Sequence, residues 1–189
     1  KPQKPNFNKR FWIMAGVGRG FVILGVVGVC LQPEVYDKDF IETPMFNNLD
    51  DKINDVASIV LQNHDSKLVF YKKDNMWFLK GKEEFLVKQN RISNLLAAIV
   101  RASVYEKKSS KAESMKKFGL LPIENSESTA IKVTLKNDDE EDVVSFEVGD
   151  YDVDLSRSAK GAYIRILPTF EVWLAKVAFI DLGLDYSGW

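Results

Sequence analysis

Three aspartates spaced two residues apart, Asp150, Asp152 and Asp154, have the spacing in this sequence that comes nearest to a known chemistry. They fall at the first, third and fifth positions of a calcium-binding loop, where carboxylate oxygens coordinate the ion. The match then fails, because Leu155 stands where the loop needs glycine and Gly161 where it needs a bidentate glutamate. The sequence therefore predicts an acidic surface loop and no metal site.

The other reactive side chains have no partners with which to build a catalytic site. One histidine, His64, lies in a turn-forming stretch, and one cysteine, Cys30, is present, so neither a zinc site nor an internal disulfide is expected. No G-x-S-x-G elbow is present to activate a serine. The acidic run 137–142 lies between two strand patterns, which is typical of a solvated hairpin tip. We therefore predict a non-catalytic protein without a cofactor.

Composition sets the broad class. The chain has 189 residues, of which 46% are apolar and 28% charged, and this is enough to bury the core of one ordinary domain. The formal net charge of -1 provides no basic field for nucleic acid. Nucleic acid is thus excluded as an expected partner.

The most hydrophobic run, residues 11–31, allows three interpretations. A dinucleotide-binding loop fails because Ile23 stands where a third glycine should follow Gly18 and Gly20. A cleaved signal fails because its apolar region is commonly about 7 to 15 residues and ends in small residues. About 20 apolar residues at 1.5 Å each cross a bilayer core of about 30 Å. We therefore predict a transmembrane helix in contact with the lipid bilayer.

The charges around this run predict its direction. Four basic residues precede it and four acidic residues follow it within 34–42, and the basic side of a span stays in the cytoplasm. Residues 1–10 are then a cytoplasmic N-terminus. The remainder is expected outside the inner membrane of a bacterium, in the periplasm, with residues 32–48 as a tether and residues 49–189 as a folded domain.

The arginine inside the run predicts that the helix binds a membrane-embedded protein partner. A central arginine in a span costs roughly 2.5–3.5 kcal/mol, which a partner carboxylate or carbonyl would offset. A G-x-x-x-G pair beside it would let a second helix approach closely. The alternative is a plain anchor, in which the bilayer thins around the arginine. The expected helix-docking residues are Gly16, Arg19, Gly20, Ile23 and Val27.

Alternation of apolar residues predicts an α+β domain that runs meander, helices, meander. After a short helix at 49–55, strands are expected at 56–62, 67–73, 76–80 and 84–87, and later at 130–136, 143–149, 161–167 and 171–175. Helices are expected at 88–104 and at 111–120, the second ending at Gly119. The apolar stripe of the longer helix comprises Ile92, Leu95, Leu96, Ile99 and Val100.

Several of these segments together resemble one family. "LDDKINDVASIVLQ" with the later "MWFL", "KFGLLP", "FEVGD", "YIRI" and "EVWLA" resembles the poorly characterised bacterial domain often encoded beside gliding-motility-type ABC transporters. The resemblance covers most of residues 49–176 and implies an N-terminal membrane segment, an exported α+β domain and an auxiliary part in a membrane assembly. It implies no catalytic residues, and Arg19 within the span departs from it.

Two functions follow as expectations. The first is a single-pass membrane subunit, without catalytic activity, that docks through its helix on membrane-embedded partners and carries a periplasmic interaction or scaffold domain. The second is a membrane-anchored module that binds a periplasmic ligand or a cell-wall polymer. A concave, aromatic-lined pocket on the sheet would favour the second.

Overall fold

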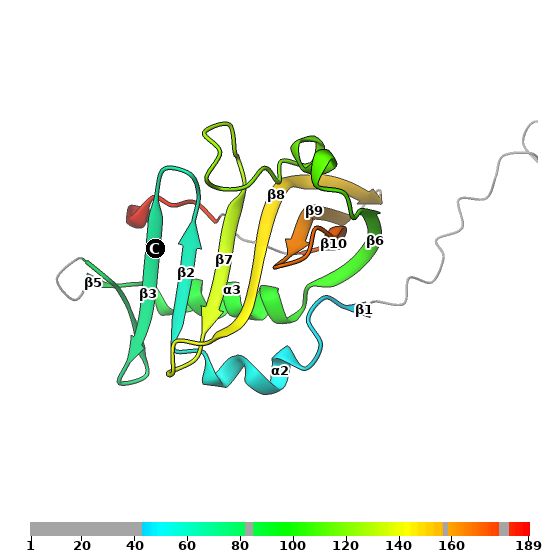
Figure 1. The fold of residues 1–189 in the computed structure, drawn as a ribbon. Helices are drawn as coiled ribbons and strands as arrows, with labels where there is room; N and C mark the ends of the chain where they lie inside the picture. Colours follow the sequence, from blue (N-terminus) through cyan, green and yellow to red (C-terminus); the bar gives the residue numbers. More distant parts are fainter. Residues whose placement is uncertain (1–42, 82–84, 157–158, 178–181) are drawn as a thin grey trace, which may run out of the picture. The chain divides into compact units, whose positions relative to one another are not determined.

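The computed structural model describes residues 43–81, 85–156, 159–177 and 182–189, which all belong to one compact unit, Ile41–Trp189. Within these ranges a ten-stranded sheet runs in the order β1-β6-β10-β9-β8-β7-β2-β3-β4-β5, and neighbouring strands are antiparallel. A few helices accompany the sheet (Figure 1). The predicted α+β class is confirmed.

The strands are β1 (Thr43–Pro44), β2 (Ser58–Gln62), β3 (Lys67–Lys73), β4 (Met76–Leu79), β5 (Phe85–Leu86), β6 (Ser103–Ser109), β7 (Ile131–Lys136), β8 (Asp142–Ser156), β9 (Ala159–Ile166) and β10 (Val172–Lys176). The helical elements are α2 (Leu49–Lys52), η1 (Ile53–Asp55), α3 (Gln89–Val100), η2 (Ala112–Phe118) and η3 (Tyr186–Gly188), the three η elements being 3-10 helices.

The two predicted meanders join into one sheet. Strands β2 to β5 form the first and β7 to β10 the second, and β2 pairs with β7 at the junction. At the other end β6 pairs with both β10 and β1. The sheet therefore depends on pairings between segments far apart in the sequence.

One face of the sheet carries the main core. The buried apolar side chains of β2, β7 and β8 alternate along their strands, as a half-buried sheet requires. Helix α3 lies against this face, behind the sheet in Figure 1, and supplies Ile92, Leu95 and Ile99. Leu96 and Val100 are partly buried at its edge, so the predicted stripe is confirmed.

The C-terminal segment also packs on this face. Trp189 is 2% exposed, its ring centroid lies 4.8 Å from that of Phe70, and its Nε1 donates to the Gly183 carbonyl oxygen at 2.8 Å. The Arg91 guanidinium lies 4.4 Å from the centroid of the Trp189 ring, and its NH1 donates to the Gly188 carbonyl oxygen at 2.9 Å. These contacts hold residues 182–189 against the sheet.

Three expectations differ from the structure. The acidic loop predicted around Asp152 is wrong, because β8 continues to Ser156 and forms a long hairpin with β9. Strand β6 was not predicted, since its charged sequence follows directly on the helical pattern. The expected tether overlaps the fold, because Thr43–Pro44 forms β1 and Met45 is buried.

The predicted transmembrane helix, residues 11–31, lies outside the described residues. Within the described ranges, no helix combines the length and the apolar character needed to cross a bilayer.

Candidate binding surface

The sheet face opposite α3 is covered over only one half. We call its uncovered part, on β2, β3, β4 and β5, the open face. Register and alternation place five apolar or aromatic side chains on it, and each is half-buried or exposed: Val60, Val69, Tyr71, Phe78 and Leu86. The Tyr71 and Phe78 rings stack with centroids 5.8 Å apart. No helix or strand in the described part of the chain packs over this row.

The other half of the same face lies under η2. Met115 and Phe118 of η2, with Leu120, pack on Val172 and Tyr163 of the sheet. The η2 segment packs closely on the sheet because glycines, which have no side chain, lie at the contact.

Gly119 follows η2 with φ of 67°, a left-handed conformation that glycine adopts without strain, as the sequence predicted for this helix end. A Cβ on Gly149 of β8 would overlap the Phe118 carbonyl oxygen and lie 2.8 Å from Leu120 Cγ. These two glycines therefore let the η2 segment rest directly on the sheet.

A groove of about 720 Å³ crosses the foot of the open face, which is within the size range of small-ligand sites. Its floor consists of β2 and β3, and its two sides are the turn between β7 and β8 and the end of β4. Figure 1 shows that this turn lies beside the end of β3 and the start of β2. The groove is lined by Ala57, Ser58, Val69, Tyr71, Lys72, Leu79, Lys80, Gly81, Asn137, Asp138 and Glu140.

The two sides of the groove carry opposite charges. Asp138 and Glu140 stand on the β7–β8 side, while Lys80 stands on the β4 side and Lys72 on β3. Among the described residues, none forms an ion pair with Asp138, Lys72 or Lys80. These three charges are therefore not neutralised within the described fold.

The acidic side is held in place by its own hydrogen bonds. The Glu141 amide donates to Asn137 Oδ1 at 2.8 Å, and Lys136 Nζ donates to the Glu140 carbonyl oxygen at 2.8 Å. Lys136 Nζ also lies 3.2 Å from Asp142 Oδ1. The turn predicted at 137–142 is thus confirmed, and its shape does not depend on a ligand.

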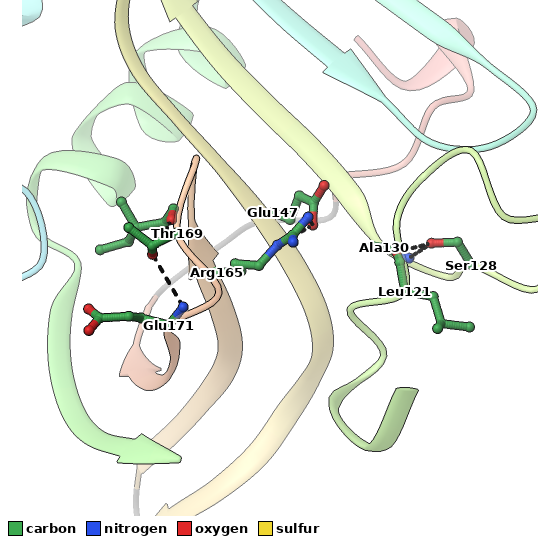
Figure 2. A network of polar contacts seen from close by, with 8 residues as sticks. Leu121, Ser128, Ala130, Glu147, Arg165, Thr169 and Glu171 are labelled. Atoms are coloured by element: carbon green, nitrogen blue, oxygen red, sulfur yellow. Dashed lines mark hydrogen bonds and ion pairs between the residues drawn. The ribbon is translucent and has the colours of Figure 1, made fainter. Parts of the chain in front are cut away.

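Between the open face and the η2 half lies a buried ion pair. Glu147 of β8 and Arg165 of β9 are direct cross-strand neighbours, 3% and 7% exposed. Arg165 donates to the same Glu147 Oε2 from Nε at 2.9 Å and from NH2 at 2.6 Å, and Figure 2 shows its side chain lying across the strands to reach it. Burial raises the pKa of Glu147, and the positive charge of Arg165 only partly opposes this. The pair has the character of a structural element, because the groove lining does not include it.

The three aspartates that suggested calcium lie along a strand instead of encircling a site. Lys160 Nζ lies 2.7 Å from Asp154 Oδ1 and 3.6 Å from Asp152 Oδ1, and the hydrogen bond to Asp154 raises the pKa of Lys160. An ammonium group therefore lies beside two of the carboxylates. In the described part of the chain, no cluster of three or more His, Cys, Asp or Glu side chains could hold a metal ion.

The remaining predicted residues take simple positions or lie outside the description. His64 is in the β2–β3 turn, where its Nδ1 is 3.2 Å from the Ile123 carbonyl oxygen. Trp77 is 7% exposed and belongs to the core. Cys30 and the five expected helix-docking residues, Gly16, Arg19, Gly20, Ile23 and Val27, lie outside the described residues.

Sequence reasoning missed the groove residues. Tyr71 and Ser58 are visible as alternate positions of two predicted strands, which places them on the face opposite Phe70 and Ile59. The sequence pattern does not show that β7 pairs with β2, and this pairing brings Asp138 to the same groove. The alternation of side chains thus predicts on which face of the sheet Tyr71 and Ser58 lie, but not that β7 is the strand next to β2.

Comparison with protein-family models, with curated proteins and with solved structures finds no match for this chain. The family resemblance therefore stays a prediction that rests on the quoted residues.

Proposed function

We propose that this protein is a non-catalytic single-pass subunit of a bacterial inner-membrane assembly. Its folded domain, on the periplasmic side, docks on a partner protein. In this proposal the helix at 11–31 contacts membrane-embedded partners through Gly16, Arg19 and Gly20, and the assembly is of the ABC-transporter type that the family resemblance implies.

The observation that carries the domain's part is the open face. Val60, Val69, Phe78 and Leu86 lie side by side on neighbouring strands, and Leu86 is 52% exposed. A contiguous apolar row with polar residues around it is the usual form of a protein contact surface. The η2 segment covers the corresponding surface on β9 and β10, which supports the view that the uncovered half is kept for a partner.

Site-specific photocrosslinking in the native membrane tests this proposal. A photoreactive phenylalanine at Phe78 on the open face should yield one discrete crosslinked protein. The same residue at Phe170, which is 50% exposed and lies beyond β9, is the matched control and should not yield that product. Equal crosslinking from both positions would remove the open face from the proposal.

The helix is tested separately by copurification. Arg19→Leu keeps the run apolar and removes its charge, so the crosslinked partner should copurify less with this variant. Unchanged recovery would show that the arginine is not a docking residue.

The groove favours a second candidate, a membrane-anchored module that binds a periplasmic ligand or cell-wall polymer. A ligand of the native state raises the unfolding free energy by an amount set by its concentration and dissociation constant. A thermal-shift screen of short peptides and cell-wall glycans should therefore find a ligand whose effect is lost in Tyr71→Ala. A shift that survives this substitution would place binding elsewhere.

A further inference from the structure

We infer that the groove at the foot of the open face binds a short peptide of about five residues through its free amino and carboxyl groups. This inference rests on the second function proposed above and names the ligand class. It follows from three properties of the groove: the charges on its sides, its span, and the polar groups on its floor.

The charges give the ligand its two ends. The Asp138 and Glu140 carboxylates on one side match a cationic amino group, and the Lys80 ammonium on the other matches a carboxylate. A ligand of a single charge would meet repulsion at one side. A ligand with opposite charges at its two ends meets attraction at both.

The strand order gives the length. The acidic turn follows β7, Lys80 follows β4, and β2 and β3 lie between them. Neighbouring strands are about 4.8 Å apart, so three spacings separate the two sides by about 14 Å across the sheet. The two sides are also offset along the strands, because the Lys80 amide bonds to Val69 whereas Lys136, next to the acidic turn, is level with Ser58 and Tyr71. From Lys80 to Asn137 this offset is about three residues, or about 10 Å, which makes the direct distance about 17 Å. An extended chain advances at most about 3.3–3.6 Å per residue, and about five residues cover this span.

The floor offers groups that suit a peptide between its ends. Ser58 is 8% exposed and lines the groove, and its hydroxyl makes no hydrogen bond within the described part of the chain. Because it faces the groove, this hydroxyl is free to bond to water or to a ligand amide. Beside it the Tyr71 ring and Val69 give an apolar surface for a side chain.

Calorimetric titration of the full chain in lipid nanodiscs tests the inference with four probes. They are penta-alanine, its N-acetylated form, its C-amidated form, and the form with both caps. Each exposed charge pair contributes modestly, so each single cap should weaken binding about two- to fivefold. The doubly capped peptide should bind most weakly.

Charge variants identify which side meets which end. Lys80→Glu should weaken penta-alanine binding and remove the effect of the C-terminal cap, because the contact that the cap removes is already lost. Asp138→Lys should do the same for the N-terminal cap. The double variant should restore binding, with the peptide reversed. Lys111→Glu, an exposed lysine outside the groove lining, is the matched control and should bind like the wild type.

The outcomes separate the ligand class from the function on which it rests. Equal binding of the four peptides, or no binding of any, overturns the peptide assignment. A neutral N-acetylglucosamine tetramer that binds the wild type but not Tyr71→Ala would also overturn it, while leaving the ligand-binding function in place.

Discussion

The Glu147–Arg165 pair allows a prediction about stability that can be worked from the geometry. Both side chains are almost completely buried, and two guanidinium nitrogens donate to one carboxylate oxygen. Removing either partner leaves the other charge buried without compensation, which costs about 3–5 kcal/mol. Glu147→Leu and Arg165→Met should each lower the unfolding free energy by about this amount at neutral pH.

The double variant should behave differently. The raised pKa of Glu147 indicates that desolvation outweighs the attraction of Arg165 for the charged carboxylate. Two apolar side chains of similar size then replace a pair that contributes little net stability. The double variant should therefore lie within about 2 kcal/mol of the wild type, which gives a coupling free energy of at least about 4 kcal/mol.

Urea unfolding of the full chain in mild detergent, followed by tryptophan fluorescence, measures these values. The buried Trp77 and Trp189 report on the core. The exposed Lys116–Glu127 pair, with Nζ and Oε2 2.8 Å apart, is the control and should show a much smaller coupling. Additive effects at Glu147 and Arg165 would refute the argument, because they would mean that water screens the pair.

Three further predictions concern pH, the η2 contact and the C-terminal segment. The folded pKa of Glu147 lies above the 4.5 of the free side chain, so the contribution of Glu147 to the unfolding free energy is full below pH 4.5 and is lost as pH rises through the folded pKa. In urea titrations, the stability of the wild type relative to Glu147→Gln should therefore fall over that pH range. A stability difference that does not change with pH would contradict this. Gly149→Ala should lower the unfolding free energy, measured by denaturation, by about 2–4 kcal/mol, because the new Cβ overlaps Phe118. In the control Gly81→Ala the new Cβ meets no atom, so only the strain of its φ of 88° remains, about 1–2 kcal/mol. Equal losses in the two variants would contradict the contact between Gly149 and η2. Trp189→Phe keeps an aromatic ring against Phe70 but loses the hydrogen bond to Gly183. A thermal melt should therefore show an unfolding free energy lower by about 1–2 kcal/mol. An unchanged melt would show that this hydrogen bond does not stabilise the fold.

Most secondary structure could be predicted because its signal is local. The alternation of Ile131, Val133 and Leu135 identified β7, and the stripe from Ile92 to Ile99 identified α3. Strand β6 was not predicted, because its exposed and charged side chains show no alternation of apolar residues. Its pairing with β10 makes this segment a strand. Tertiary pairing decided where local propensity did not.

The candidate site was less predictable than the fold. Its floor follows from alternation in β2 and β3, but its charged sides meet only through the β2–β7 pairing. The loop predicted at the aspartates of β8 was wrong for a related reason. A spacing of two residues fits the ligand positions of a calcium loop, and it also fits one face of a strand. The backbone conformation, which spacing does not determine, distinguishes the two.

The order of strands also bears on when the domain can fold. Strand β2 needs β7 as a neighbour, and in the register Ser58 pairs with Lys136; at the other end Ser103 pairs with Lys176. Such non-local pairings form slowly because long loops must close first. If the chain crosses the membrane from its N-terminus, as proposed, the sheet cannot close until β10 has emerged. Until then β6 lacks its β10 neighbour, and Trp189, which follows β10, cannot cover Phe70 of β3, so export and folding of this domain are coupled at its last strand.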